Sequence, residues 1–129
     1  IRLTLEGIRR FYPGRKLVVD FMSHTYSRTE GLLEEFASSF GAADEVILNN
    51  IYASAREKNS GSDLDRRFFE ALCRHHSNVK YFPRPDDGFD YLKTHLQRDH
   101  IFITMGAGDN WTVGKMLYDY FSCKKEALT

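Results

Sequence analysis

The sequence has few cysteines, few prolines and no long apolar run, and its charges cancel. Its 129 residues include two cysteines and three prolines, and 18 basic side chains balance 18 acidic ones. Cys73 and Cys123 lie far apart, which excludes a CxxC pair or a zinc-site spacing and predicts buried or idle thiols in a reducing cytosol. Balanced charge creates no overall field for nucleic acid, and no apolar run approaches the roughly 20 residues of a membrane helix. We therefore expect one globular domain, residues 1–129, that binds neither nucleic acid nor membranes.

Short apolar runs alternate with helical patterns along the chain. The runs predict strands at residues 17–22, 46–51, 79–82 and 101–105. None of them alternates apolar with polar residues, which indicates strands covered on both faces. Helical spacing of apolar residues occupies residues 1–12, 32–40, 64–75, 89–96 and 113–121. The fold class is therefore α/β, a three-layer α/β/α domain with a mainly parallel, Rossmann-like sheet.

Polar residues follow the first strand at once, in the stretch "FMSHTYSRT". Ligands of parallel sheets bind in the loops at the carboxyl ends of the strands. Ser27 or Thr29 can cap the next helix, and Arg28 near its N-terminus would then bind a carboxylate or phosphate. In the alternative interpretation both hydroxyls only cap, and Arg28 pairs with Glu30 or Glu34 on the surface.

The loop after the last strand, "ITMGAGDNWTVG", is rich in glycine. Gly106 and Gly108 permit a tight turn and close backbone approach to a ligand, and Asp109 or Asn110 can cap the next helix. No Lys-Ser or Lys-Thr pair follows, so the loop is not a P-loop, and Trp111 breaks the dinucleotide fingerprint. A simple turn is the alternative interpretation.

The loop after the second strand, "NNIYASAREKNSGSD", is long and polar. Tyr52 and Arg56 can face the same cleft as the other two loops. The alternative is an ordinary solvated loop.

Together, "FMSHTYSRT", "IYASAREK" and "MGAGD" resemble the C-terminal domain of the Mur ligases. That family has a phrase close to F-Q-P-H-R-Y-[ST]-R-T after a core strand, then D-[IV]-Y-x-A and M-G-A-G-D. The motifs occur here in the same order over nearly the whole chain, most like the ligases that join L-alanine to UDP-N-acetylmuramate. Family members also have a UDP-sugar domain and a central ATPase domain. The resemblance implies that this chain is the third domain alone and that a strand preceding Ile1 is missing from it.

The resemblance implies ATP-dependent amide bond formation in bacterial, cytoplasmic peptidoglycan synthesis. ATP would phosphorylate the lactyl carboxylate of the sugar, and the amine of L-alanine would attack the acyl phosphate to give an amide, ADP and phosphate. ATP and Mg²⁺ would bind mainly to the absent central domain, so that this domain lacks turnover alone. The implied alanine site consists of Arg28 on the carboxylate, with His24, Tyr26 and Ser27 shaping the pocket. Backbone donors beside the amine and the transferring phosphate would come from Gly106, Ala107, Gly108 and Asp109.

Two departures from the family pattern bear on selectivity. Met22-Ser23 replaces the usual Gln-Pro, and Thr25 replaces the first arginine. Loss of that arginine predicts weaker alanine binding or acceptance of glycine or serine, unless Arg56 substitutes for it. Two other functions remain as alternatives: a murein peptide-recycling ligase domain, and a non-catalytic α/β module that binds a small anion.

Overall fold

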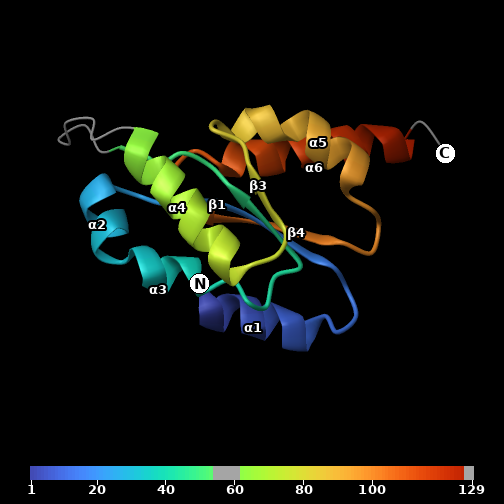
Figure 1. Ribbon diagram of the computed structural model, residues 1–129. Helices are drawn as coiled ribbons and strands as arrows, with labels where there is room; N and C mark the ends of the chain where they lie inside the picture. Colours follow the sequence, from blue (N-terminus) through green and yellow to red (C-terminus); the bar gives the residue numbers. More distant parts are fainter. Residues whose placement is uncertain (54–61, 127–129) are drawn as a thin grey trace.

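Helices and strands alternate along the computed structural model, which describes residues 1–53 and 62–126 (Figure 1). In chain order the elements are α1 (Arg2–Phe11), β1 (Leu17–Met22), α2 (Tyr26–Gly31), α3 (Leu33–Ala37), β2 (Glu45–Leu48), α4 (Ser62–His75), β3 (Val79–Tyr81), the 3₁₀ helix η1 (Pro85–Gly88), α5 (Phe89–His95), β4 (Ile101–Gly106) and α6 (Trp111–Glu126).

The sheet contains β1 to β4 in the order β3-β2-β1-β4, and every pairing is parallel. Every residue of β1 and β2 is buried, whereas β3 and β4 form the edges and are partly exposed. The parallel sheet is confirmed. The expectation that all four strands are covered on both faces holds for the two central strands and is wrong for the edges.

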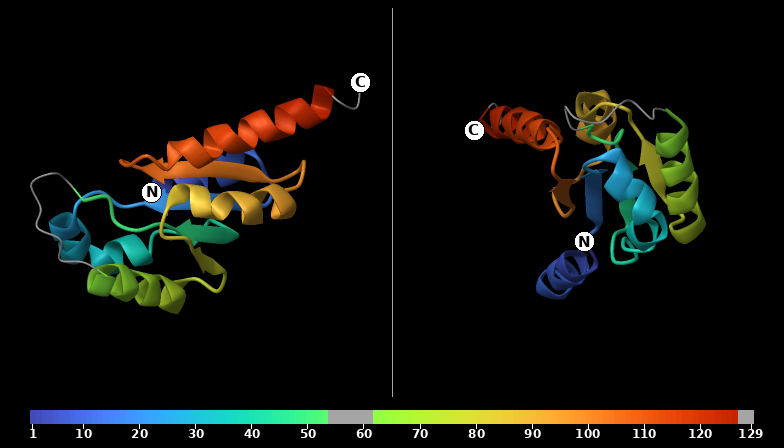
Figure 2. Two further views of the ribbon diagram at one scale, coloured as in Figure 1. Left: turned by 90° about the horizontal axis from the view of Figure 1, so that it is seen from above. Right: turned by 90° about the vertical axis from the view of Figure 1, so that its left-hand side faces the viewer.

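Each face of the sheet carries its own apolar cluster. On one face, residues of β1 and β2 pack with α1, α4 and the segment after α3, which contribute the buried side chains of Leu5, Phe40, Phe68 and Leu72. On the other face, Val18 and Ile47 pack against Leu92 of α5 and against Val113 and Leu117 of α6. Figure 2 shows the sheet between these groups of helices. The three-layer architecture is confirmed.

The helix expected over residues 32–40 differs from the prediction. The chain forms two short helices, α2 and α3, which meet at Leu32, where φ is −122°. Gly31 stands at this break, and glycine weakens helices because its backbone loses the most freedom on ordering. The cysteines were predicted to be buried or idle; Cys73 and Cys123 are free and exposed, so the buried alternative is wrong. In residues 1–53 and 62–126, no helix has the length and apolar character to span a bilayer.

Candidate functional site

Two buried hydroxyls close the loop after β1. Ser23 Oγ lies 2.6 Å from Thr29 Oγ1, which itself donates a hydrogen bond to the Thr25 carbonyl at 2.7 Å. Thr25 precedes α2, makes no side-chain cap and has φ of 63°, a conformation that strains a β-branched residue. The predicted cap by Ser27 or Thr29 is therefore wrong. Thr29 lies within α2, and its hydroxyl holds the loop by hydrogen bonds to Ser23 and Thr25.

Arg28 has no carboxylate within ion-pair distance in the part of the chain that the structure describes. Glu30 instead pairs with Arg67 at 3.2 Å, and Glu34 pairs with Arg74 at 2.7 Å. Surface pairing of Arg28 with either glutamate is therefore wrong. The expected helix N-terminus lies close to Arg28, because Arg28 is the third residue of α2, although this helix has only six residues. The exposed guanidinium remains available to an anionic ligand.

The loops after β1 and β4 lie at the same edge of the sheet, as the sequence predicts. Met22 pairs with Gly106 in the strand register. Beside this pair lies a cavity of about 240 Å³, whose lining includes His24, Arg28, Gly106 and Ala107. Its remaining walls come from Ile1, Phe21, Met22, Ser23, Phe36 and Met105. One cavity therefore joins a guanidinium, an imidazole and the backbone of the glycine loop.

The glycine loop packs tightly on the end of β1. Gly106 has φ of 127°, and a Cβ there would lie 1.9 Å from the Met22 carbonyl oxygen. A Cβ on Gly108 would lie 2.0 Å from Met22 Sδ. These glycines permit close approach of the loop backbone to β1. At the far end of the loop, the Asp109 carbonyl accepts a hydrogen bond from the Thr112 amide at 3.0 Å. The side chain of Asn110 does not cap α6 but hydrogen-bonds to β1.

Tyr52 lies next to the first loop. The Thr25 amide donates to the Tyr52 carbonyl at 3.0 Å, and the Tyr52 amide donates to the Ser23 carbonyl at 2.8 Å. The rings of His24 and Tyr52 stack, with centroids 6.0 Å apart and 23° between their planes. Tyr52 and Asp109 line a second cavity of about 400 Å³, which Met22 separates from the first by lining both. Arg56, expected in the same cleft, lies outside the described residues.

Tyr26 and Ser27 do not line the cavity at Arg28. Tyr26 is 8% exposed and packs with Ile51 and Leu64. Its side chain hydrogen-bonds Asp65, which also accepts the Ile51 amide at 2.8 Å. Burial raises the pKa of Asp65 against both hydrogen bonds. Tyr26 thus packs against the segment that carries Tyr52. Ser27 is exposed.

A buried polar network behind the loops was missed from the sequence. Asp20 of β1 is fully buried, and its carboxyl accepts hydrogen bonds from Asn110 at 2.9 Å and Asn49 at 3.4 Å. Burial raises the pKa of Asp20 to about 7, although both amide hydrogen bonds lower it. Asn49 Oδ1 is buried with no hydrogen-bond partner among residues 1–53 and 62–126. The signal in the sequence was a single carboxylate inside an otherwise apolar strand.

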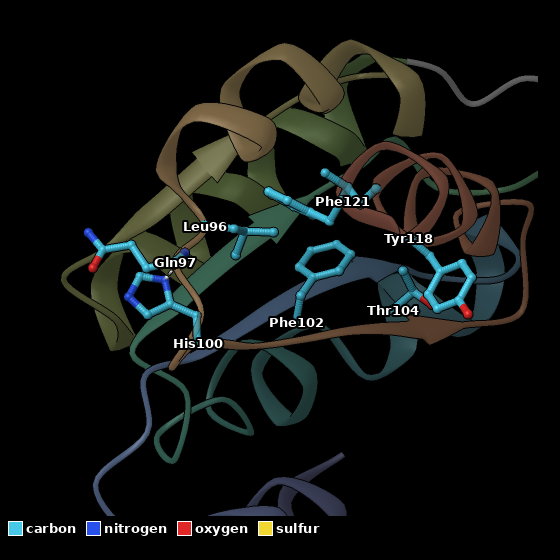
Figure 3. Close-up of a pocket in the computed structure, with 9 residues that line it drawn as sticks. Leu96, Gln97, His100, Phe102, Thr104, Tyr118 and Phe121 are labelled. Carbon is cyan, nitrogen blue, oxygen red and sulfur yellow. Dashed lines mark hydrogen bonds between the residues drawn. The ribbon is translucent and has the colours of Figure 1, made fainter. Parts of the chain in front are cut away.

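A further cavity of about 340 Å³ lies along β4, between α5 and α6. In Figure 3 the side chains of Leu96 and Phe121 converge on the ring of Phe102, with His100 at one end and Tyr118 at the other. None of the predicted site residues that the structure describes lines this cavity. In the described ranges, no three His, Cys, Asp or Glu side chains are grouped closely enough to hold a metal ion.

No protein-family model matches the chain. It is 48% identical, over 121 residues, to a UDP-N-acetylmuramate–L-alanine ligase of Treponema pallidum (strain Nichols), an alignment that covers 94% of the chain and 25% of that protein. A ligase of the same name from Desulfitobacterium hafniense (strain Y51) is 40% identical over 117 residues, 91% of the chain and 26% of that protein. The chain is homologous to a Mur ligase domain. It spans about a quarter of the length of these curated relatives.

The fold of the chain also occurs in a solved structure. A murein peptide ligase from Psychrobacter arcticus 273-4 superposes with a TM-score of 0.68, covering 92% of the chain and 24% of that protein. Its sequence identity is 15%, so this likeness concerns the fold alone.

Proposed function

We propose that the chain is the C-terminal domain of a UDP-N-acetylmuramate–L-alanine ligase and that the loops after β1 and β4 receive L-alanine. The observation that carries the proposal is the cavity of about 240 Å³ that joins Arg28 and His24 to the backbone of Gly106 and Ala107. The identity of 48% to a ligase of that name supports the same assignment.

In this proposal Arg28 binds the carboxylate of the amino acid. A guanidinium engages two carboxylate oxygens at once. Among the described residues Arg28 has no carboxylate within ion-pair distance, since Glu30 and Glu34 pair elsewhere. A hydrogen bond to a charged group contributes roughly 1.5–3 kcal/mol. His24, held by its stacking on Tyr52, lines the same cavity and shapes it together with Met22.

The reaction proposed is attack of the alanine amine on an acyl phosphate of the sugar's lactyl carboxylate. The new C–N bond forms as the C–O bond to phosphate breaks, and the amine loses a proton. Backbone N–H groups of the glycine loop, Gly106 to Asp109, would stabilise the developing oxyanion. ATP, Mg²⁺ and the UDP-sugar would bind mainly to the remainder of the ligase, in the bacterial cytoplasm, so this domain alone would not turn over.

Two other functions make different predictions. One is a murein peptide-recycling ligase domain; the Psychrobacter arcticus structure, at 15% identity, shows only that such a ligase shares the fold. The higher identity to alanine ligases favours our proposal. A non-catalytic anion-binding module would need Arg28 and the cavity, but no partner domains.

The test is phosphate release by the full-length ligase with ATP, Mg²⁺ and UDP-N-acetylmuramate, across L-alanine, glycine, L-serine and a murein tripeptide. Release with L-alanine supports the proposal. Release best with glycine or serine keeps the ligase and ties Thr25 to selectivity. Release with the tripeptide alone supports the recycling ligase, and no release with any acceptor contradicts both enzymes.

A further inference from the structure

We propose that Asp20 positions the glycine loop through Asn110, and so sets the geometry of the cavity wall that faces the amino acid. The inference rests on the proposed function for its catalytic consequence. The structural consequence, an ordered glycine loop, rests on the buried hydrogen bonds alone. Asp20 itself does not line either cavity at the strand ends, so its role is positioning.

Asn110 fastens the far end of the glycine loop to two strands. It directly follows Asp109, is 3% exposed, and its Nδ2 lies 2.9 Å from Asp20 Oδ1. The same nitrogen lies 3.2 Å from the Asp20 carbonyl oxygen and 3.0 Å from the Met105 carbonyl oxygen. One side-chain amide therefore joins the loop to the middle of β1 and the end of β4.

The other oxygen of the carboxyl reaches the neighbouring strand. Asn49, just past the end of β2, donates from Nδ2 to Asp20 Oδ2 at 3.4 Å and to the Phe82 carbonyl oxygen at 3.1 Å. Phe82 follows β3. Asp20 thus lies at the centre of a hydrogen-bond network that connects the segments at the carboxyl ends of all four strands.

Stability alone does not account for a carboxyl at this position. Asp20 lies on the same face of β1 as Val18, whose neighbours are apolar, and burying a polar group there is unfavourable compared with an aliphatic side chain. The network also leaves Asn49 Oδ1 without a hydrogen-bond partner among the described residues. What the carboxyl provides is an acceptor for Asn110. That bond fixes a loop whose Gly108 would touch both Met22 and Tyr52 if it carried a Cβ.

The test compares Asp20→Leu with Val18→Ala in the full-length ligase. Val18→Ala is the matched control, because it disturbs the same strand and face without touching the loop. Two quantities are measured: amide hydrogen exchange across residues 106–112, and the steady-state kinetics with L-alanine. We expect Asp20→Leu to accelerate exchange in that segment and to lower kcat/KM about tenfold, as for the loss of one hydrogen bond. Asp20→Asn keeps an acceptor oxygen for Asn110 and should restore both quantities to within about twofold of wild type.

Unchanged exchange in residues 106–112 of Asp20→Leu would overturn the proposal, as would equal kinetic losses in Asp20→Leu and Val18→Ala. If Asp20→Leu does not fold, Asn110→Ala removes the same hydrogen bond from the loop side. It should then show the same faster exchange in residues 106–112 and the same loss of kcat/KM. If the wild-type ligase forms no amide, the proposed function fails. The exchange measurement still decides whether Asp20 orders the loop.

Discussion

Replacing Asp20 by asparagine should change how the stability of the fold depends on pH. The carboxyl of Asp20 is fully buried, and burial raises its pKa from the ordinary value of 3.8 to about 7. Between these two values the folded chain holds a proton on Asp20 that the unfolded chain has released. The free energy of unfolding therefore falls as the pH rises through this window.

The size of the effect follows from the two pKa values. Each pH unit between 3.8 and about 7 removes about 1.4 kcal/mol. The contribution of Asp20 is thus fully present below about pH 4, and on the order of 4 kcal/mol of it is lost by about pH 7 to 8. The amide of the Asp20→Asn variant does not titrate, so the variant lacks this slope.

The assay is urea unfolding of the 129-residue chain and of Asp20→Asn at several pH values from about 4.5 to 8. We expect the free energy of unfolding of the wild type to decline relative to that of the variant up to about pH 7 and to level off above it. Asp90→Asn serves as a control, because the Asp90 side chain is 84% exposed and its curve should parallel the wild type. Parallel curves for wild type and Asp20→Asn would refute the reasoning and mean that Asp20 is already ionised in the fold.

Two further substitutions test the strained and crowded backbone of the site. Gly106→Ala should destabilise the chain by at least about 2 kcal/mol in urea unfolding, because the new Cβ meets the Met22 carbonyl and φ is 127°. Gly41→Ala, with open space around its Cβ, should change stability little, and equal effects would disprove the crowding. Thr25→Gly should stabilise the chain by about 1 kcal/mol by relieving the strain of φ at 63°. A loss of stability would show that the Thr25 side chain contributes more than its strain costs.

The layers of the fold and the meeting of two loops could be predicted from the sequence. Unbroken apolar runs such as residues 17–22 predict central strands, and parallel strands necessarily bring their carboxyl ends to one edge. The strand order β3-β2-β1-β4 could not be predicted, because an edge strand and a central strand differ by their neighbours as much as by their own residues. The break at Leu32 was missed because the apolar stripe begins there, and the residues before it, which form α2, are mostly polar.

The details of the site depended on contacts that spacing cannot specify. Arg28 was predicted either to bind an anion or to pair with a nearby glutamate. The outcome depends on Arg67 and Arg74, which the fold brings from α4 to Glu30 and Glu34. Tyr26 belongs to the same polar motif. As the first residue of α2, however, it packs in the core with Ile51. Asp20 was passed over because only the fold shows that Asn110, far along the chain, lies beside it.

The most direct measurement of the central claim is the KM for L-alanine of the full-length ligase carrying Arg28→Ala. Arg74→Ala is the matched control, since it removes an exposed arginine whose partner is Glu34. If Arg28 binds the amino-acid carboxylate, its loss removes at least ~1.4 kcal/mol of binding and raises the KM at least ~10-fold, while the control stays near wild type. An unchanged KM for Arg28→Ala would contradict the assignment of these loops as the amino-acid site.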